Sequence, residues 1–282
     1  MKLSLLLVSY QSFAPLRACL QSVEKAMTRI PGGVEVIVVD NASTDRTPEL
    51  LAPVFPFVKW VVNTGNTGFS RACNQGFARC SGEYALFLNP DTVIPEDGLI
   101  KPLEFLSAHP GIGALGVRMV NDKGVFLKES KRGHPGPAAS FFKLFGLARL
   151  FPQSPVFAAY YAGHLKEDQE GEVDVLSGAY LMVRSALFRS LGGFDESFFM
   201  YAEDIDLSLR VKKAGYACYY FPAITILHSK GMSTQKDQVY VNRFYGAMSL
   251  FVKKYYGHQP LKSFFLQSGI RLRKTLARIT GR

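Results

Sequence analysis

Residues 1–90 alternate strand-like apolar runs with segments of helical periodicity, and this alternation constrains the fold more than any other feature. The runs KLSLLLVSY, VEVIVVD, VKWVVN and EYALFLN predict strands. VEVIVVD is almost continuously apolar, which is typical of a strand buried on both faces of a parallel sheet. Segment 14–28 and SRACNQGFARC have helical patterns. Strands separated by helices predict βαβ units, and so an α/β fold with a mostly parallel sheet.

The second half of the chain is less regular. From 121 to 172 the periodicity fails, and KRGHPGPAASFFKLFGLARLFPQSP indicates an irregular excursion with a short helix. VDVLSGAYLMVRSALFRSLGGF then predicts a strand and a helix that ends at Gly192 and Gly193. A helix around 204–214, short strands at YACYYFP and AITILH, and a helical tail from Tyr240 complete the expected order. GIGALG matches a dinucleotide-binding pattern by letter, but it precedes a strand-like segment, so we discard that interpretation.

Composition narrows the class of protein. The 282 residues are 48% hydrophobic and 20% charged, as expected of a soluble globular chain. No apolar run reaches the roughly 18–20 residues that cross a bilayer, and the N-terminal run is shorter than a signal peptide. The four cysteines are scattered, without zinc-site spacing or a disulfide framework. We therefore expect a cytoplasmic protein.

The net charge of +10 is concentrated in the tail. Nine Lys and Arg residues and no acids follow position 238, so the first 238 residues carry only about one net positive charge. This distribution argues against general nucleic-acid binding. For 261–282 two interpretations stay open: a solvated basic helix, or a helix lying on an anionic membrane surface.

Polar residues gather where the predicted strands end. They are Ser9 and Tyr10, Asp40 and Asn41, Asn63, and Asn89 with Asp91. Ligands of open α/β sheets bind at the carboxyl edge of the strands, so we expect the site there. Asp40 is placed to accept a hydrogen bond from a base or ribose, whereas Asp45 fits a helix cap equally well. The glycine-rich NTGNTGFSRACNQG could cradle phosphate at a helix N-terminus or form a simple turn.

Asp91 and His228 are candidate metal ligands. Asp91 follows a strand at the expected ligand edge, and one carboxylate with diphosphate oxygens and water suits Mg²⁺ or Mn²⁺. His228 ends AITILH and could add a nitrogen ligand, which favours Mn²⁺. A turn aspartate and a structural histidine are the competing interpretations.

The stretch YAEDIDLSLR places three acids at the start of a helix. Asp206 and Arg210 are four residues apart and can form an ion pair, and the helix dipole stabilises acids in a first turn. Asp204 points away from that face, which leaves it free to act in a pocket.

Together these stretches resemble the inverting nucleotide-sugar glycosyltransferases of family 2, particularly the bacterial rhamnosyltransferase-like branch. The resemblance covers about residues 1–255 and rests on VSYQS, VVDNASTD, NTGFSRACNQG, LFLNPDT, LSGAYLMVRSALFRSLGGFDESFFMYAEDIDLSLRVKKAGY and ILH. It implies a GT-A fold: a Rossmann-like sheet flanked by helices, here with a C-terminal helical tail. The expected domains are a catalytic domain at 1–238, with donor binding in 1–120 and the acceptor side in 121–238, and a basic extension at 239–282.

The resemblance also implies roles for individual residues. Asp204 would be the catalytic base, with Glu203 tuning it, and Asp91 and His228 would bind Mg²⁺ or Mn²⁺. Asn89 stands where relatives often carry the first acid of the metal-binding motif, which puts the strictness of the metal requirement in question. Residues expected to bind the nucleotide sugar are Ser9, Tyr10, Asp40 (to the nucleobase), Asn41, Asn66, Gly68, Arg71, Asn74 and Asn89. Residues expected on the acceptor side are Gly178, Ala179 and Asp195.

The expected activity is metal-dependent transfer of a sugar from a nucleoside diphosphate sugar, with dTDP-rhamnose as one candidate. The acceptor would be a growing bacterial surface glycan that is lipid-linked in many relatives, which suggests peripheral association with the inner face of the cytoplasmic membrane. Two alternatives stay open. A nucleotidyltransferase would need a glycine-rich basic loop after the first strand, which VSYQSFAPLR lacks. A non-catalytic sugar-nucleotide or glycan-binding module would not need Asp204. The donor sugar, linkage and oligomeric state do not follow from the sequence.

Overall fold

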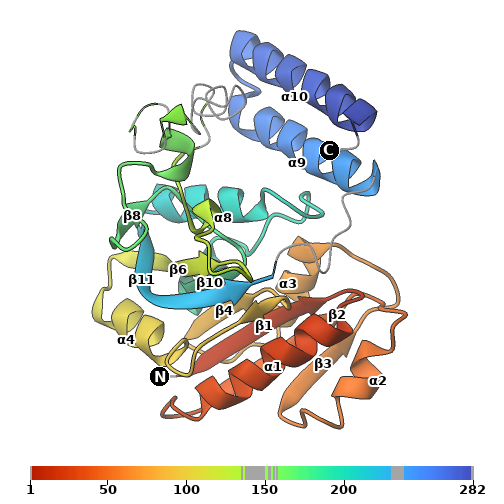
Figure 1. Ribbon diagram of the computed structural model, residues 1–282, viewed down its shortest axis with the longest axis vertical. Helices are drawn as coiled ribbons and strands as arrows, with labels where there is room; N and C mark the ends of the chain where they lie inside the picture. The colour runs from red at the N-terminus through yellow and green to blue at the C-terminus, as the bar shows by residue number, and fades with distance from the viewer. Residues whose placement is uncertain are drawn as a thin grey trace.

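The computed structural model describes residues 2–134, 136, 150, 151, 154, 156, 158–229 and 238–280. Over these residues the chain forms a mixed nine-stranded sheet with helices on both faces and a helical pair at its C-terminal end (Figure 1). The strands of the sheet are β1 (Leu3–Ser9), β2 (Val34–Asp40), β3 (Val58–Val62), β4 (Tyr84–Leu88), β5 (Thr92–Val93), β6 (Ile112–Val120), β8 (Gly171–Val173), β10 (Tyr180–Arg184) and β11 (Ala217–His228). The helices are α1 (Phe13–Met27), α2 (Thr47–Leu51), α3 (Phe69–Phe77), α4 (Ile100–Ala108), α7 (Ser185–Ser190), α8 (Glu203–Lys213), α9 (Gln238–Tyr256) and α10 (Pro260–Thr280).

The first half of the chain builds the parallel part of the sheet, as the alternation of strands and helices predicted. The spatial order is β3-β2-β1-β4, and all three neighbouring pairs are parallel. Successive side chains of β1 enter opposite cores: Leu5 packs on the side of α1 and α4, whereas Leu6 packs on the side of α3, α7 and α8. Because both faces are covered, the strands are apolar at nearly every position.

The second half of the sheet differs from the prediction of separate short strands. β10 lies antiparallel between β4 and β6. YACYYFP and AITILH, predicted as two strands, form the single strand β11, so that prediction was wrong. β11 pairs with β6 on both sides of a register shift between Phe221 and Thr225. Pro222 lies within that shift. Proline lacks a backbone N–H and cannot donate to the strand pairing, so sheets tolerate it at such irregularities. GIGALG was expected to precede a strand, but residues 112–116 of it are themselves the start of β6.

Strands from both predicted halves of the catalytic domain share this sheet, and the boundaries at 120 and 238 stay predictions. A second, two-stranded sheet pairs β7 (Lys131–Arg132) with β9 (Val175–Leu176). The short helix predicted within 131–155 falls mostly outside the described residues. The β7–β9 sheet matters because it brings residue 132 next to the start of α8.

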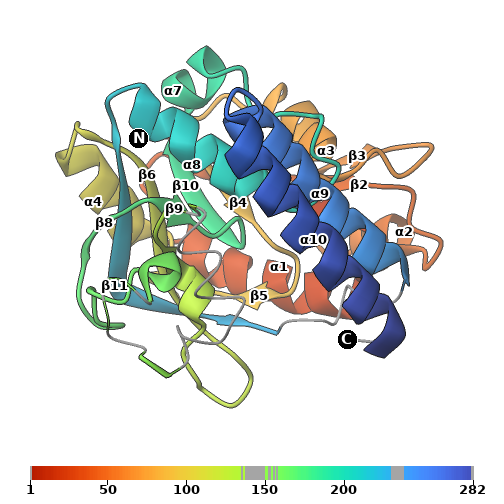
Figure 2. The ribbon, with the colours of Figure 1, turned by 90° about the horizontal axis from the view of Figure 1, so that it is seen from above.

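The C-terminal tail is helical, as predicted, and forms a hairpin of α9 and α10. A third apolar cluster joins α9 to the segment before α8 through Phe198, Ala202, Phe251 and other buried side chains. Helix α10 lies on the far side of α9 from the sheet, so it is the outer layer in both views (Figures 1 and 2). Among the described helices, none combines the length and apolarity needed to cross a membrane.

Candidate active site

The carboxyl ends of β1, β2 and β4 meet at one edge of the sheet, as expected for parallel neighbours. Asn41 donates its backbone N–H to the Ser9 carbonyl at 2.8 Å. Its side chain accepts a hydrogen bond from Asn63 Nδ2 at 2.9 Å and donates to the Gly68 carbonyl at 3.1 Å. The sequence-predicted polar residues at these strand ends therefore do come together. We call these strand ends and the loop 63–68 the donor edge.

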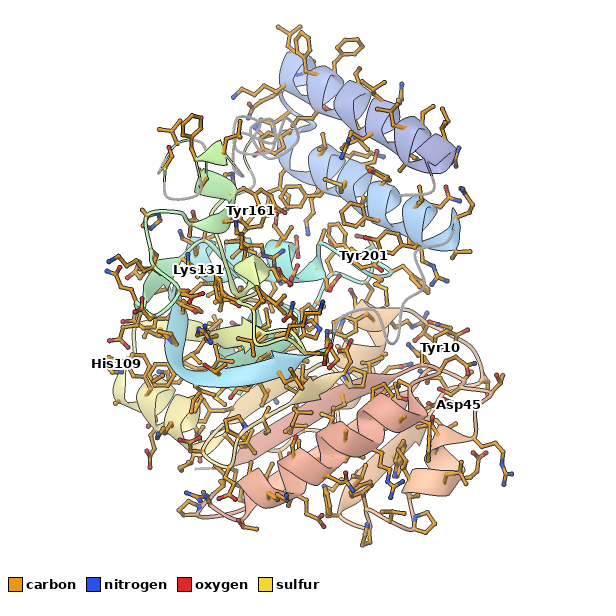
Figure 3. The ribbon with its side chains drawn as sticks, viewed as in Figure 1. Tyr10, Asp45, His109, Lys131, Tyr161 and Tyr201 are labelled. Carbon is orange, nitrogen blue, oxygen red and sulfur yellow. The ribbon has the colours of Figure 1, made fainter. Side chains whose placement is uncertain are left out.

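The two aspartates after β2 have different local roles. Asp40 is buried, and its carboxylate accepts hydrogen bonds from Ser43, from N–H at 2.8 Å and from Oγ at 2.6 Å. Asp45 Oδ1 accepts from the N–H of Thr47, and Oδ2 accepts from the N–H of Phe13, so this side chain caps the first turns of two helices. Asp45 therefore serves N–H groups at two helix starts, as a cap would, although the N-cap residue of α2 is Arg46. Tyr10, at this same end of the molecule, is 42% exposed (Figure 3).

Gly68 ties the donor edge to the segment that precedes α8. Its φ is +87°, and a Cβ there would lie 2.6 Å from the Phe199 carbonyl oxygen, so only glycine fits without rearrangement. The Phe199 carbonyl accepts the Phe69 N–H at 2.7 Å. Asn66 Oδ1 accepts the Gly68 N–H at 3.0 Å and shapes the turn. The backbone of the segment before α8 therefore holds this loop in place. The loop is the one that was expected to contact the donor.

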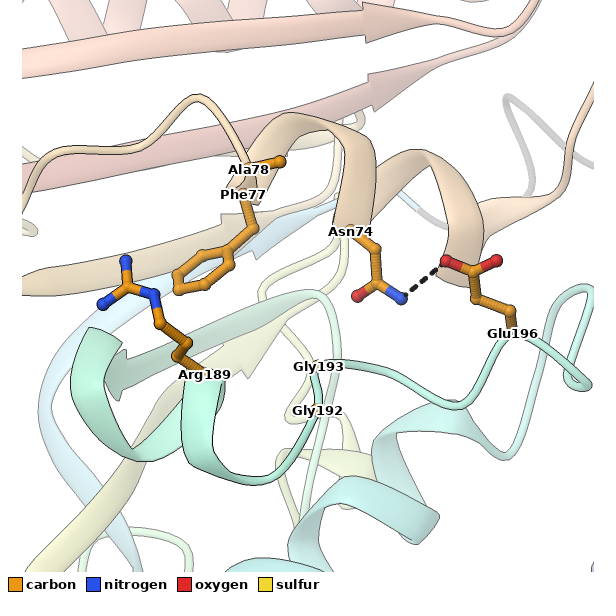
Figure 4. A pocket seen from close by; sticks show the side chains of 7 residues that line it. All are labelled: Asn74, Phe77, Ala78, Arg189, Gly192, Gly193 and Glu196. Atoms are coloured by element: carbon orange, nitrogen blue, oxygen red, sulfur yellow. Dashed lines mark hydrogen bonds between the residues drawn. The ribbon is translucent and has the colours of Figure 1, made fainter.

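Arg71 and Asn74, predicted to bind the donor, are engaged with the segment after α7. The Asn74 amide exchanges two hydrogen bonds of 2.9 Å with the Phe194 backbone and donates to Glu196. Arg71 Nε lies 3.9 Å from Glu196 Oε2. A cavity of about 370 Å³ lies here (Figure 4), lined by Asn74, Phe77, Ala78, Arg189, Gly192, Gly193 and Glu196. Their contact with a donor stays a prediction.

Asp91 and His228 lie side by side because β5 pairs antiparallel with the end of β11. His228 is opposite Thr92 in the register, and its Nε2 lies 3.3 Å from Asp91 Oδ1. Two ligands at right angles on an Mg²⁺- or Mn²⁺-sized ion lie roughly 3 Å apart, so the pair fits one divalent cation. His228 is buried, and its Nδ1 has no hydrogen-bond partner among the described residues. Within the described ranges no group of three or more His, Cys, Asp or Glu is placed to hold a metal.

Asp204 lies at the start of α8 with its carboxylate oriented by three contacts. Oδ2 accepts hydrogen bonds from Arg132 Nη2 at 2.5 Å and from the Gly178 N–H at 3.2 Å, while Oδ1 accepts from the Ile205 N–H. Its side chain keeps 15% of its surface exposed. The neighbouring Ala179 carbonyl accepts the Asn89 N–H at 3.0 Å. Residues 178 and 179 therefore connect Asp204 to the donor edge.

Sequence reasoning missed Arg132. Its Nη2 also donates to the Leu176 carbonyl at 2.7 Å, and its side chain is 12% exposed. Lys131, the other residue of β7, is buried and donates to backbone carbonyls, one of them of Tyr161 (Figure 3). Lys131 and Arg132 lie in a stretch without periodicity. No local pattern in the sequence therefore distinguishes these buried bases from bases exposed to solvent.

Glu203 lies beside Asp204 and is buried. Burial, and secondarily the Asp204 carboxylate, raise the pKa of Glu203 to about 8. Its Oε2 has no hydrogen-bond partner among the described residues. The raised pKa favours the protonated form of Glu203, in which the carboxyl group can donate a hydrogen bond.

The backbone is strained on both sides of this site. Tyr201 and Ala202, directly before α8, have φ of +70° and +66°. Gln11, Ala42 and Arg46, in the loops after β1 and β2, also have positive φ. Such conformations cost about 1–3 kcal/mol each in non-glycine residues and gather at functional sites. Their position agrees with a site between the donor edge and α8.

Asp206 and Asp195 anchor α9. Asp206 is fully buried and accepts hydrogen bonds from Arg210 Nε at 2.7 Å, Lys254 Nζ at 2.5 Å and the Tyr255 hydroxyl at 2.7 Å. The predicted Asp206–Arg210 pair is confirmed. Asp195 accepts from the same Lys254; although burial raises its pKa, the bonds from Lys254 and Ser197 lower it to about 2. Its expected contact with the acceptor stays a prediction.

The Rossmann-like mixed sheet, with its strand ends facing an acidic helix start, agrees with the GT-A fold expected from the sequence. The chain belongs to glycosyl transferase family 2: the model of that family matches residues 4–170, and that of glycosyl transferase family group 2 matches residues 158–279.

Its relatives include sugar transferases from bacteria and archaea. The chain is 33% identical over 241 residues to the N-acetylglucosaminyl-diphospho-decaprenol L-rhamnosyltransferase of Mycobacterium tuberculosis, covering 82% of this chain and 76% of the relative. It is 26% identical to the low-salt glycan biosynthesis hexosyltransferase Agl10 of Haloferax volcanii, covering 89% and 77%. It is 30% identical to the rhamnosyltransferase WbbL of Escherichia coli, covering 52% of each chain. The protein is thus a rhamnosyltransferase-like glycosyltransferase.

Solved structures share the fold. The mannosyltransferase PcManGT from Pyrobaculum calidifontis, in complex with GDP-Man and Mn²⁺, superposes with a TM-score of 0.63 at 18% identity, covering 99% of this chain and 76% of that one. TarS of S. aureus superposes with a TM-score of 0.59 at 20% identity; the match covers 89% of this chain but only 39% of TarS.

Proposed function

We propose that this protein is an inverting, divalent-metal-dependent glycosyltransferase that moves a rhamnosyl group from dTDP-rhamnose to a lipid-linked glycan acceptor of a bacterial surface polysaccharide. The observation that carries the proposal is the Asp204 carboxylate. It is oriented by Arg132 and Gly178, remains partly exposed, and is connected through Ala179 to the donor edge.

Asp204 acts as the general base. Its carboxylate takes the proton from an acceptor hydroxyl as that oxygen forms a bond to the anomeric carbon. The bond from that carbon to the diphosphate breaks on the opposite face, and the nucleoside diphosphate leaves, so the anomeric configuration inverts. Arg132 holds the carboxylate in one orientation, and Glu203, whose pKa burial raises, lies beside it.

Asp91 and His228 would hold Mg²⁺ or Mn²⁺. The ion, when bound, supplies positive charge that stabilises the departing diphosphate. Their 3.3 Å separation supports this role, as does the Mn²⁺ in the PcManGT complex. Asp40 and the residues around it would bind the nucleotide, since the donor edge is where sheets of this kind bind such ligands.

The rhamnosyl donor and lipid-linked acceptor rest on the relatives. The mycobacterial relative is named as a rhamnosyltransferase acting on N-acetylglucosaminyl-diphospho-decaprenol, and WbbL is also named as a rhamnosyltransferase. Both relatives are named for rhamnosyl transfer, which supports rhamnose over mannose, the sugar of the donor in the PcManGT complex.

The base assignment is tested by transfer from dTDP-rhamnose to a lipid-linked N-acetylglucosamine acceptor, followed by mass spectrometry of the product. Asp204→Asn should lower kcat by about 10²–10⁴-fold, the usual contribution of a general base. Asp168→Asn, an exposed acid away from the site, is the matched control. Full transfer by Asp204→Asn would contradict the mechanism, and no transfer from any nucleotide sugar by the wild type would favour the binding-module alternative.

Metal binding is tested by thermal unfolding with dTDP and dTDP-rhamnose, each with and without Mn²⁺. A ligand at 100 times its Kd stabilises the native state by about 2.7 kcal/mol. The Mn²⁺-dependent part of the shift should be lost in a variant combining Asp91→Asn with His228→Asn and retained in Asp97→Asn. Retention in the double variant would show that another site binds the ion.

A further inference from the structure

Helix α10 has two apolar faces, and only one of them is covered. On the inner face Leu266 and Ile270 pack against the α9 cluster, and Ala277 is buried. Gln267 on this face bonds to Ser249 of α9. A helix that merely completed the fold would be polar on its other side.

The opposite face of α10 is apolar and exposed. It carries five large side chains between 63% and 76% exposed: Leu261, Phe264, Phe265, Leu272 and Ile279. At about 100° per residue they fall within an arc of roughly 100°, and at 1.5 Å per residue they extend over roughly 27 Å of the helix. Scattered exposed apolar residues need no explanation, but an aligned set on an outer helix does. We call this set the α10 outer stripe.

Basic side chains border the α10 outer stripe on both sides. By the same helical spacing Lys262 and Arg273 follow one border, and Arg271 and Arg278 follow the other. No acid occurs from 238 to 280, so no charge within α9 or α10 neutralises them. An apolar stripe between two basic borders matches the boundary of an anionic bilayer, where acyl chains lie beneath negative headgroups.

We propose that the α10 outer stripe binds the surface of an anionic lipid bilayer, with α10 lying in the plane of the interface. The stripe inserts its apolar side chains among the acyl chains, and the bordering bases contact anionic headgroups. A second copy of the chain fits less well, because a symmetric contact would bring two sets of these arginines and lysines together without acids to pair them. The helix lies on the surface rather than spanning it, since no described helix could cross a membrane.

The position of α10 determines where a bound bilayer would lie relative to the α8 acids. α9 lies between α10 and the start of α8, and Lys254 of α9 bonds to both Asp195 and Asp206. A bilayer bound to α10 therefore lies on the side of the molecule where the α8 acids are, the side expected to receive the acceptor. The proposal itself does not depend on the sugar chemistry, because vesicle binding is measured without donor or acceptor.

The test is co-sedimentation of the full chain with vesicles of phosphatidylcholine alone and of phosphatidylcholine mixed equally with phosphatidylglycerol. The wild type should bind the anionic vesicles and bind less as salt rises. Combining Phe264→Ser with Phe265→Ser should weaken binding at least about tenfold, because two large apolar side chains no longer insert. The matched control is Val54→Ser with Val125→Ser, two other exposed apolar residues.

A second pair of variants tests the basic borders. Arg271→Gln with Arg273→Gln should weaken binding about tenfold, and Lys123→Gln with Lys166→Gln, which removes the same charge elsewhere, should not. All these side chains are exposed, so circular dichroism should show unchanged folding. Equal binding by the wild type and the phenylalanine variant would overturn the proposal. So would a dimer, detected by analytical ultracentrifugation, that the phenylalanine substitutions dissolve while vesicle binding persists.

Discussion

The donor edge and the start of α8 lie at the same end of the sheet, but their carboxylates are held in different ways. At the donor edge Asp40 is held by Ser43, three residues away, and Asp45 caps Thr47, two residues away. At α8, Asp204 is held by Arg132, 72 positions away in the sequence, and Asp206 by Lys254, 48 positions away. Asp40 is therefore held within its own turn, whereas the α8 acids depend on distant segments that must dock correctly.

The largest effect in this comparison is expected at Asp206. Asp206→Ala removes the buried counter-charge that Arg210 and Lys254 share and leaves Lys254 only Asp195, so the free energy of unfolding should fall by about 3–5 kcal/mol. Urea denaturation measures this. Asp168→Ala should change stability by less than about 0.5 kcal/mol. A small loss in Asp206→Ala would show that α9 docks without this network.

Glu203 should make the α8 region sensitive to pH. Its pKa is raised in the folded state, so the native protein binds more protons than the unfolded chain between about pH 4.5 and about pH 8. Stability contributed by the neutral acid is present below this window and is lost as the pH rises through it. Glu203→Gln, which cannot ionise, should become more stable relative to the wild type by roughly 2–4 kcal/mol across the window.

Urea titrations at several pH values measure the effect of Glu203→Gln. Glu170→Gln, at an exposed position, is the control and should run parallel to the wild type. Parallel curves for Glu203→Gln as well would show that Glu203 ionises freely at neutral pH.

Substitutions of Arg132 test whether the docked β7–β9 sheet orients Asp204. Arg132→Met should lower the free energy of unfolding by about 1.5–3 kcal/mol, because it removes hydrogen bonds to a charged and partly buried carboxylate. Transfer should fall as well, and Arg132→Lys should recover part of both losses. Arg118→Met, at a more exposed pair with Glu167, is the matched control. Unchanged transfer in Arg132→Met would remove Arg132 from the site.

The smallest effect is expected at the donor edge. Ser43→Ala removes one side-chain bond to Asp40 but leaves the backbone bond from residue 43 in place. The expected loss of stability is about 1 kcal/mol, measured by urea denaturation against Ser107→Ala. A loss of stability as large as that of Asp206→Ala would contradict the distinction between Asp40, held within its own turn, and the α8 acids, held by distant segments.

The strand ends of the donor edge were predictable from local patterns, although the contacts that join them are long-range. Apolar runs and helical spacing in residues 1–90 indicated the parallel strands, and parallel topology alone places Ser9, Asp40 and Asn89 at one edge. The division of the α8 acids was also predictable, because helical geometry separates Asp204 from the Asp206–Arg210 face. Their chemical roles came from the resemblance to family 2 and stay predictions.

Other features were decided by contacts that no local pattern encodes. Hydrophobic runs do not show that β10 is antiparallel, or that β11 continues through Pro222, since both follow from pairing with neighbouring strands. The docking of Asn74 on Phe194 likewise joins segments about 120 positions apart.

The sequence by itself determined the fold class, the edge of the sheet where the polar strand ends gather, and the acids at the start of α8, because all three follow from short-range periodicity and strand ends. Only the tertiary structure decided that Arg132 meets Asp204, that Lys254 closes the Asp206 network, and that α10 turns one apolar face outward. These depend on which distant segments lie together, and the free energy of such contacts comes from burial and charge pairing that exist only once the chain is folded.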